Sequence, residues 1–175
     1  MNQITEQSKK AYEKELKELY KEMPHQEKRV REARALGDIS ENAEYAKAQE
    51  ELTTSQSRII ELEYILNTSQ VVKDTGGPEM GIGSYVRVTK LDENGKAIAE
   101  PKLFILDSVE RYLDGHLGIS SPLGKEILNN VSKRFTITTN HGNTLHYKVE
   151  KVPISDEVEA EFSSIYKGKD AIFNG

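Results

Sequence analysis

Two acidic residues, Asp38 and Glu41, lie three positions apart just after Gly37. Mg²⁺ is commonly held by one or two protein carboxylates together with water and the phosphates of a substrate. A single pair of carboxylates is too few for a self-contained magnesium site. Such a pair can, however, complete a site whose other ligands come from a partner. The residue types therefore allow a shared metal site as one role for this pair.

The same spacing also fits a purely structural role. In a capping box, the N-cap side chain and an acidic side chain three residues later satisfy backbone N–H groups at a helix start. Asp38 as N-cap with Glu41 at the third helical position has this pattern, and acids also suit the positive end of the helix dipole. Ser40 is a competing N-cap that would shift the helix start. Helix capping and metal binding therefore both remain open.

The acidic pair lies between two segments with a heptad pattern. One series of spacings of four and three residues begins at Tyr12, and a second begins at Tyr45. The intervening positions are mostly Lys, Glu, Gln and Arg, which is typical of helices packed along one seam. The two segments therefore predict an antiparallel helical hairpin over residues 1–72, with its tip at 36–44. Pro24 is expected to kink or end the first helix.

A cluster of basic residues precedes the tip and consists of Lys28, Arg29, Arg31 and Arg34. Such a cluster can contact the phosphates of a nucleic acid, with an affinity that depends on salt. The alternative is a solvated helix face with ion pairs at a spacing of four, such as Glu27 with Arg31.

The pattern changes after residue 72. Residues 73–84 are rich in glycine and predict a linker. Residues 85–152 contain β-branched and aromatic segments that predict the strands 85–91, 102–109, 134–140 and 144–152. A short helix is expected over 120–130, with Ser121 as its N-cap and Pro122 at its first position. The acidic residues 153–175 predict either a terminal helix or a disordered tail.

The composition excludes several classes of protein. The chain has 175 residues, a net charge of −5 and no cysteine, which excludes a disulfide framework and a thiol nucleophile. Only 36% of the residues are hydrophobic, so one large core is not expected. The longest apolar runs are too short for a membrane span, and the start of the chain lacks the apolar core of a signal peptide. A cytoplasmic protein without a membrane partner is therefore expected.

The run EARALGDISENAEY, residues 32–45, resembles the tip signature of the bacterial Gre-type transcript cleavage and elongation factors. Pro24 also lies where that family has a proline, thirteen residues before the tip glycine. The stretch 119–123, which contains Ser121 and Pro122, resembles a serine-proline stretch in the second domain of the family. The resemblance is strong before residue 72 and weaker as far as about residue 152.

The resemblance implies an α+β fold, with an N-terminal antiparallel coiled-coil hairpin followed by a small FKBP-like antiparallel β-sheet domain with a short helix. It implies an accessory factor, not itself an enzyme, that binds RNA polymerase and inserts its hairpin into the secondary channel. There it would stimulate cleavage of the 3′ end of backtracked nascent RNA, so that elongation resumes. By resemblance Asp38 and Glu41 are the catalytic acids, which hold a Mg²⁺ shared with the polymerase. The free protein is expected to be a monomer without a cofactor.

The resemblance also assigns roles to other residues. Five are expected to shape the tip, namely Gly37, Ser40, Asn42, Glu44 and Tyr45. Tyr45 lies on the heptad seam, where packing explains it equally well. The basic cluster is expected to contact RNA or polymerase, and Ser121 with Pro122 is expected to dock polymerase.

The second domain departs from the family pattern at Asn129-Asn130, at Lys133-Arg134 and at His141-Gly142-Asn143. These departures concern the docking surface and leave the tip intact. Two alternatives remain open. One is a channel-binding regulator that does not stimulate cleavage, although relatives of that kind have altered tips. The other is a coiled-coil adaptor whose tip acids only cap a helix.

Overall fold

A computed structural model describes the backbone of residues 2–37, 42–129 and 134–173. The chain forms two compact units. Met1–Asn2 and Gln7–Ser69 make up the first unit, whereas Gln3–Glu6 and Gln70–Gly175 make up the second. The sequence pattern did not predict that residues before the first helix belong to the second unit.

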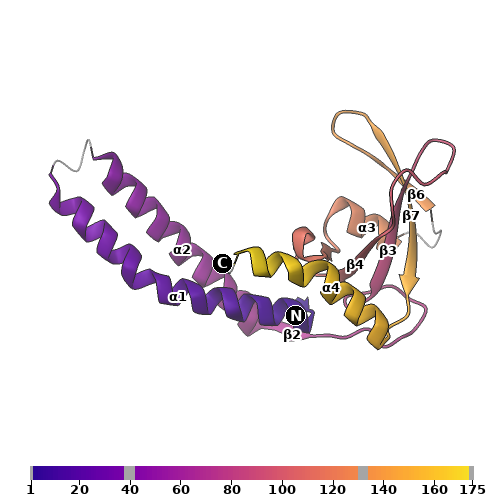
Figure 1. Ribbon diagram of the computed structural model, residues 1–175, viewed down its shortest axis with the longest axis horizontal. Coiled ribbons are helices and arrows are strands. Elements are labelled where there is room, and N and C mark those ends of the chain that lie inside the picture. The colour runs from indigo at the N-terminus through magenta and orange to yellow at the C-terminus, as the bar shows by residue number, and fades with distance from the viewer. Residues whose placement is uncertain (1, 38–41, 130–133, 174–175) are drawn as a thin grey trace. The chain divides into compact units, whose positions relative to one another are not determined.

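The first unit is a helical hairpin of α1 (Glu6–Ala35) and α2 (Ala43–Thr68) (Figure 1). At 1.5 Å per residue, α1 is about 45 Å long. Apart from Ser8, the buried side chains of the two helices lie on the seam predicted from the heptads; they are Tyr12, Ala33, Ala48, Leu52, Ser55, Ile59 and Leu62. The predicted hairpin is therefore confirmed. Pro24 lies inside α1, which does not end there.

Polar contacts cross the hairpin and set its register. Within the seam, Nε2 of Gln26 donates a hydrogen bond of 2.9 Å to Oγ of Ser55. Farther from the tip, the guanidinium of Arg58 forms hydrogen bonds of 2.7 and 3.0 Å to the carboxylate of Glu15. The same guanidinium lies 5.5 Å from the centre of the Tyr12 ring. Because such contacts are satisfied in only one alignment, they disfavour sliding of one helix along the other.

The second unit contains a five-stranded sheet with the order β5-β4-β3-β7-β6. Its strands are β3 (Tyr85–Leu91), β4 (Lys102–Asp107), β5 (His116–Gly118), β6 (Arg134–Thr138) and β7 (Thr144–Val152). Neighbouring strands are antiparallel except for β4 and β5, which are parallel. The predicted α+β fold class, a helical hairpin followed by a small, mostly antiparallel sheet domain, is confirmed.

Four short elements were not predicted. The strands β1 (Asn2–Ile4) and β2 (Ser69–Val71) form a separate two-stranded sheet, η1 (Tyr112–Asp114) is a single 3₁₀ turn, and the strand β5 follows it. Each contains three residues, which is too short for a hydrophobic period to be read from the sequence.

The helix α3 (Pro122–Asn129) packs on one face of the sheet, where Ile127 joins a core that includes Val86, Leu106 and Val149. The predicted helix start is confirmed, because Oγ of Ser121 accepts a hydrogen bond of 3.1 Å from the Gly124 N–H. Pro122 is the first residue of the helix.

The helix α4 (Asp156–Phe173) packs on the opposite face of the same sheet (Figure 1). Its side chains Val158, Phe162 and Tyr166 belong to a second apolar cluster with Tyr85, Leu103 and Ile105, against which Val152 also packs. Of the two alternatives predicted for the acidic tail over 153–175, the structure shows the terminal helix, and this helix is packed on the sheet rather than separate from it. The apolar side chains recur every four residues and form one face of a helix, although acidic residues dominate the composition of the segment.

Residues 73–84 are also not a free linker. The Lys151 ammonium on β7 binds the Asp74 carboxylate, with contacts of 3.2 Å to Oδ1 and 3.0 Å to Oδ2. It also donates to the carbonyl oxygens of Gly77 and Glu79, at 2.5 and 2.6 Å. This cluster, which we call the Lys151 clasp, holds the glycine-rich segment against the sheet unit.

Among the helices that the structure describes, none combines the length and the apolar character that a membrane span requires.

Candidate functional site: the hairpin tip

The helix α1 ends at Ala35 and α2 begins at Ala43. Of the predicted tip residues, Asp38, Ser40 and Glu41 lie outside the residues that the structure describes. Their predicted roles therefore rest on the sequence, while the described residues on either side define the ends of the connection.

Asn42 is the N-cap of α2. Its backbone is extended, with φ −82° and ψ 95°, and its side-chain Oδ1 accepts a hydrogen bond of 3.1 Å from the Tyr45 N–H. Its Nδ2 donates a second hydrogen bond of 2.7 Å to the carbonyl oxygen of Ala33 in the last turn of α1. The predictions that Asp38 or Ser40 caps this helix are therefore wrong.

The choice of Asn42 has a physical explanation. Asparagine and aspartate are about equally good acceptors at an N-cap. Only the amide can also donate, because an ionised carboxylate has acceptors alone. The carbonyl groups in the last turn of a helix lack helical partners and need donors from elsewhere. Asn42 supplies one such donor to α1 while it caps α2.

Gly37 follows α1 with φ +137°, a conformation that side-chain-bearing residues rarely adopt. A Cβ atom at this position would meet nothing within 4 Å, so the backbone conformation rather than space favours glycine. Glycine here therefore allows the chain to leave α1 in a direction that other residues would resist.

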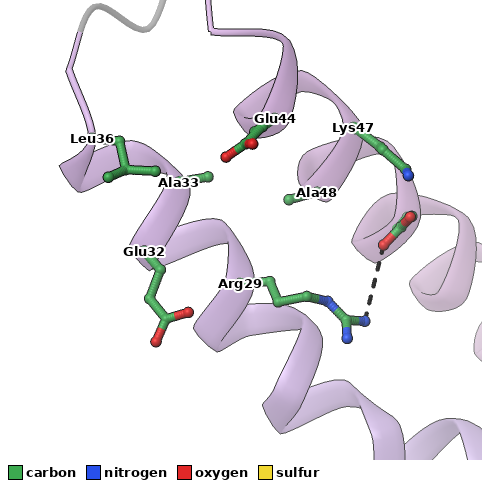
Figure 2. A pocket seen from close by; sticks show the side chains of 8 residues that line it. Arg29, Glu32, Ala33, Leu36, Glu44, Lys47 and Ala48 are labelled. Atoms are coloured by element: carbon green, nitrogen blue, oxygen red, sulfur yellow. Dashed lines mark ion pairs between the residues drawn. The ribbon is translucent and has the colours of Figure 1, made fainter.

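A groove of about 710 Å³ lies between the two helices next to the tip (Figure 2). Its lining comes from both helices and comprises Arg29, Glu32, Ala33, Leu36, Glu44, Lys47, Ala48 and Glu51. The small side chains of Ala33 and Ala48 leave this space open on the seam. Figure 2 shows the Glu44 carboxylate directed across the groove toward α1.

The structure separates the four residues of the basic cluster, all of which are exposed. Lys28 pairs with Glu32 along α1 at 3.6 Å. Arg29 points toward α2 (Figure 2), and its guanidinium lies 3.1 Å from Glu22 and 3.9 Å from Glu51. These three carboxylates partly neutralise two of the four cations.

Arg31 and Arg34 differ from the other two. They lie three residues apart near the end of α1, so both project from one side of the helix. Among the residues that the structure describes, neither forms an ion pair, and the alternative pair of Glu27 with Arg31 is not formed. Neither of these two guanidinium groups has a described carboxylate partner.

Carboxylate oxygens are the ligands that Mg²⁺ prefers, so the donor types of Asp38 and Glu41 fit this ion. Within the described ranges, no group of three or more His, Asp or Glu side chains is arranged to hold a metal. The nearest described acid along the chain is Glu44, in the first turn of α2.

The predicted docking residues lie at the start of α3. Ser121 is half-buried, and its hydroxyl donates to the Gly118 carbonyl at 2.7 Å while it caps the helix. Pro122 is exposed beside it. Asn129 ends α3, whereas Asn130 and Lys133 lie outside the described residues.

A buried polar cluster in the second unit was missed from the sequence. The Asp107 carboxylate accepts a hydrogen bond of 2.6 Å from the Thr5 hydroxyl and lies 2.9 Å from Nδ1 of His116. All three residues are almost completely buried. The contact attaches the start of the chain to β4, but Thr5 and Asp107 are 102 positions apart, and no local pattern connects them.

Comparison with known proteins identifies the class. The family model described as "Transcription elongation factor, N-terminal" matches residues 2–71, which is the hairpin. The transcription elongation factor GreA of Thermotoga neapolitana is 33% identical over 151 residues, covering 83% of this chain and 94% of that protein. GreA of Bacillus velezensis is 31% identical over 154 residues, covering 85% and 94%.

Among solved structures, the GreA factor homolog 1 of Thermus thermophilus covers 85% of this chain and 96% of its own, with 18% identity and a TM-score of 0.40. The match of the family model and the identity to GreA sequences place the chain among the transcription elongation factors. The chain belongs to the Gre family of these factors, on the basis of the sequence identity across most of its length.

Proposed function

We propose that this Gre-family protein binds RNA polymerase, inserts its hairpin into the secondary channel and stimulates cleavage of backtracked nascent RNA by the polymerase. The observation that carries the proposal is the cap of α2. Because Asn42 caps the helix, Asp38 and Glu41 are not required to begin it. Two carboxylates without this structural duty, at the end of a helix about 45 Å long, suit delivery to a distant site.

Asp38 and Glu41 would supply carboxylate oxygens to a Mg²⁺ shared with the polymerase. When bound, this ion supplies Lewis-acid chemistry, which activates water and stabilises the developing charge at the cleaved phosphate. The chain contributes the negative charge and holds it at the tip. The protein accordingly acts as an accessory factor, and the polymerase and the 3′ end of the RNA complete the site.

Arg31 and Arg34 are proposed to contact phosphates of the RNA or the channel wall. Their guanidinium groups are exposed and have no described carboxylate partner, so neither must give up an observed ion pair in order to bind phosphate. Lys28 and Arg29 are proposed as weaker contacts, because each would have to give up an ion pair.

The second unit is proposed to dock on polymerase through the side that carries α3, where Pro122 is exposed. The opposite face of the sheet is covered by α4, and the core residues Tyr85, Leu103 and Ile105 are buried beneath it. Because α3 covers the other face, a partner would contact the outer side of a helix or a sheet edge, and the proposal assigns this contact to the start of α3.

The test is RNA cleavage in a stalled, backtracked polymerase complex, comparing the wild type with Asp38→Asn/Glu41→Gln. The matched control is Glu18→Gln/Glu50→Gln, which removes the same charge elsewhere on the hairpin. We expect the wild type and the control to shorten the RNA from its 3′ end and the tip variant to lose this activity while remaining folded. If the wild type binds polymerase without promoting cleavage, the protein is a channel regulator and the proposal is wrong.

The adaptor alternative makes a different prediction. If the acids served only as a cap, their neutralisation would destabilise the hairpin by about 0.5–2 kcal/mol. Because Asn42 is the observed cap, we expect the melting temperature of Asp38→Asn/Glu41→Gln to remain close to that of the wild type. A clear loss of hairpin stability in this variant, together with no stimulation of cleavage by the wild type, would favour the adaptor over the cleavage factor.

A further inference from the structure

The side chain of Asn42 joins the two helix ends at the tip. Its Oδ1 accepts from the Tyr45 N–H of α2 at 3.1 Å, and its Nδ2 donates to the Ala33 carbonyl of α1 at 2.7 Å. The Ala33 carbonyl also accepts from the Leu36 N–H at 3.3 Å. One amide therefore links the last turn of one helix to the first turn of the other.

Both partners fix the orientation of this amide. If its oxygen and nitrogen were exchanged, the NH₂ group would face the Tyr45 N–H and the oxygen would face the Ala33 carbonyl. Each contact would then join two donors or two acceptors. The site therefore requires a side chain with a donor and an acceptor on separate atoms, which asparagine has and aspartate lacks.

We propose that Asn42 is a positioning residue for the tip acids, an inference that rests on the proposed cleavage function. The two hydrogen bonds hold the ends of the connection between α1 and α2 at a fixed separation. A connection with fixed ends has fewer conformations than one whose ends can move apart. We infer that Asn42 thereby restricts the positions available to the carboxylates of Asp38 and Glu41. This restriction matters for the cleavage rate, because a misplacement of about 1 Å can lower a rate about a hundredfold.

The decisive variant is Asn42→Asp. A carboxylate keeps the acceptor for the Tyr45 N–H, so the helix cap is retained. It loses the donor to Ala33 and places a negative charge beside that carbonyl oxygen. The matched control is Gln49→Glu, which adds the same charge at an exposed position of α2 near the tip.

Three measurements separate positioning from a structural role. The first two are the maximal cleavage rate at saturating factor and the factor concentration that gives half of that rate. The third is amide hydrogen exchange at Tyr45 in the free protein, which reports the cap without polymerase. For Asn42→Asp we expect a maximal rate at least about tenfold lower, with the half-saturating concentration and Tyr45 protection unchanged. Gln49→Glu should match the wild type in all three.

A wild-type maximal rate in Asn42→Asp would overturn the positioning role while leaving the proposed function intact. An increase only in the half-saturating concentration would also overturn it, because the loss would then lie in binding. If the Tyr45 N–H loses protection in Asn42→Asp, the helix cap itself has failed, and Asn42→Ser replaces it as the test variant. Serine keeps an acceptor for the cap, but its side chain has one polar atom in place of two and so does not bridge both helix ends. Serine with full activity would refute the proposal. Absence of cleavage by the wild type would overturn the proposed function and the positioning role together.

Discussion

Replacement of Lys151 by methionine tests whether the Lys151 clasp stabilises the second unit. Methionine keeps most of the length of the side chain and removes its charge. The Lys151 side chain is 14% exposed and the Asp74 side chain only 6%, so the substitution leaves a buried carboxylate without its cation. The Gly76 N–H, which donates at 3.0 Å, remains as a partner. The carbonyl groups of Gly77 and Glu79 also lose their donor.

The expected cost follows from this burial. Removal of one partner from a buried ion pair costs about 3–5 kcal/mol. The glycine-rich segment can open and admit water, so we expect the lower end of that range, about 3 kcal/mol. Lys148→Met is the matched control on the same strand, because Lys148 pairs with Glu150 at 3.0 Å while both side chains are well exposed. An exposed pair of this kind contributes less than about 1 kcal/mol.

The assay is urea denaturation followed through tyrosine fluorescence. The single variant Asp74→Asn and the double variant Asp74→Asn/Lys151→Met complete a thermodynamic cycle. A coupling of about 1 kcal/mol or more between the two side chains is expected. Amide exchange at Leu106, whose N–H bonds to the Ser84 carbonyl at 2.9 Å, should accelerate in Lys151→Met. The reasoning is refuted if Lys151→Met costs no more than Lys148→Met.

Three further predictions concern the same unit. Gly124→Ala should destabilise this unit by about 1–3 kcal/mol and weaken polymerase binding, because the new Cβ would lie 2.0 Å from the Gly118 carbonyl oxygen. The control is Gly81→Ala, whose new Cβ would have no atom within 4 Å. This variant should match the wild type in the same melting and binding assays. Phe162→Ala should cost about 3–5 kcal/mol in denaturation, because its ring is buried against Tyr85 and His116, and a cost below 1 kcal/mol would mean that α4 does not stabilise the sheet. Burial alone would raise the pKa of Asp74, but the Gly76 N–H and the Lys151 ammonium outweigh it, and the pKa lies below its ordinary value of 3.8. The stability that this carboxylate contributes is present above pH 3.8 and is lost as the pH falls through the lower pKa of Asp74 in the folded protein. In acid denaturation curves, the free energy of unfolding of the wild type should therefore approach that of Asp74→Asn. A difference that stays constant with pH would contradict this assignment.

Local patterns in the sequence predicted most of the secondary structure. The heptads starting at Tyr12 and Tyr45 identified the buried seam, and Ser121-Pro122 identified the start of α3. The cap of α2 was not predicted, because Asp38, Ser40 and Asn42 are all good N-caps within five positions. The choice among them depends on a contact across the hairpin to Ala33, which no local pattern records.

Long-range contacts explain the other differences. Lys151 and Asp74 are 77 positions apart, so the glycine-rich segment had the composition of a linker. The acidic residues of α4 hid an apolar face with a period of four, formed by Val158, Phe162 and Tyr166. The closeness of α4 to β5 also requires Gly115, where a Cβ would lie 2.4 Å from the Tyr166 ring.

The contact between Thr5 and Asp107 has a consequence for folding and for the construction of chimeras. Because Gln3–Glu6 belong with Gln70–Gly175, the hairpin is an insertion within a second unit whose two parts are separated along the chain. During synthesis Thr5 emerges about a hundred residues before its partner, so the sheet unit cannot be completed until the whole hairpin has left the ribosome. A single cut near residue 72 would take Thr5 away with the hairpin and leave Asp107 short of a donor. Exchange of hairpins between relatives should instead use two junctions, near residues 6 and 70, where Ile4 and Val72 are already joined by a backbone hydrogen bond of 2.9 Å.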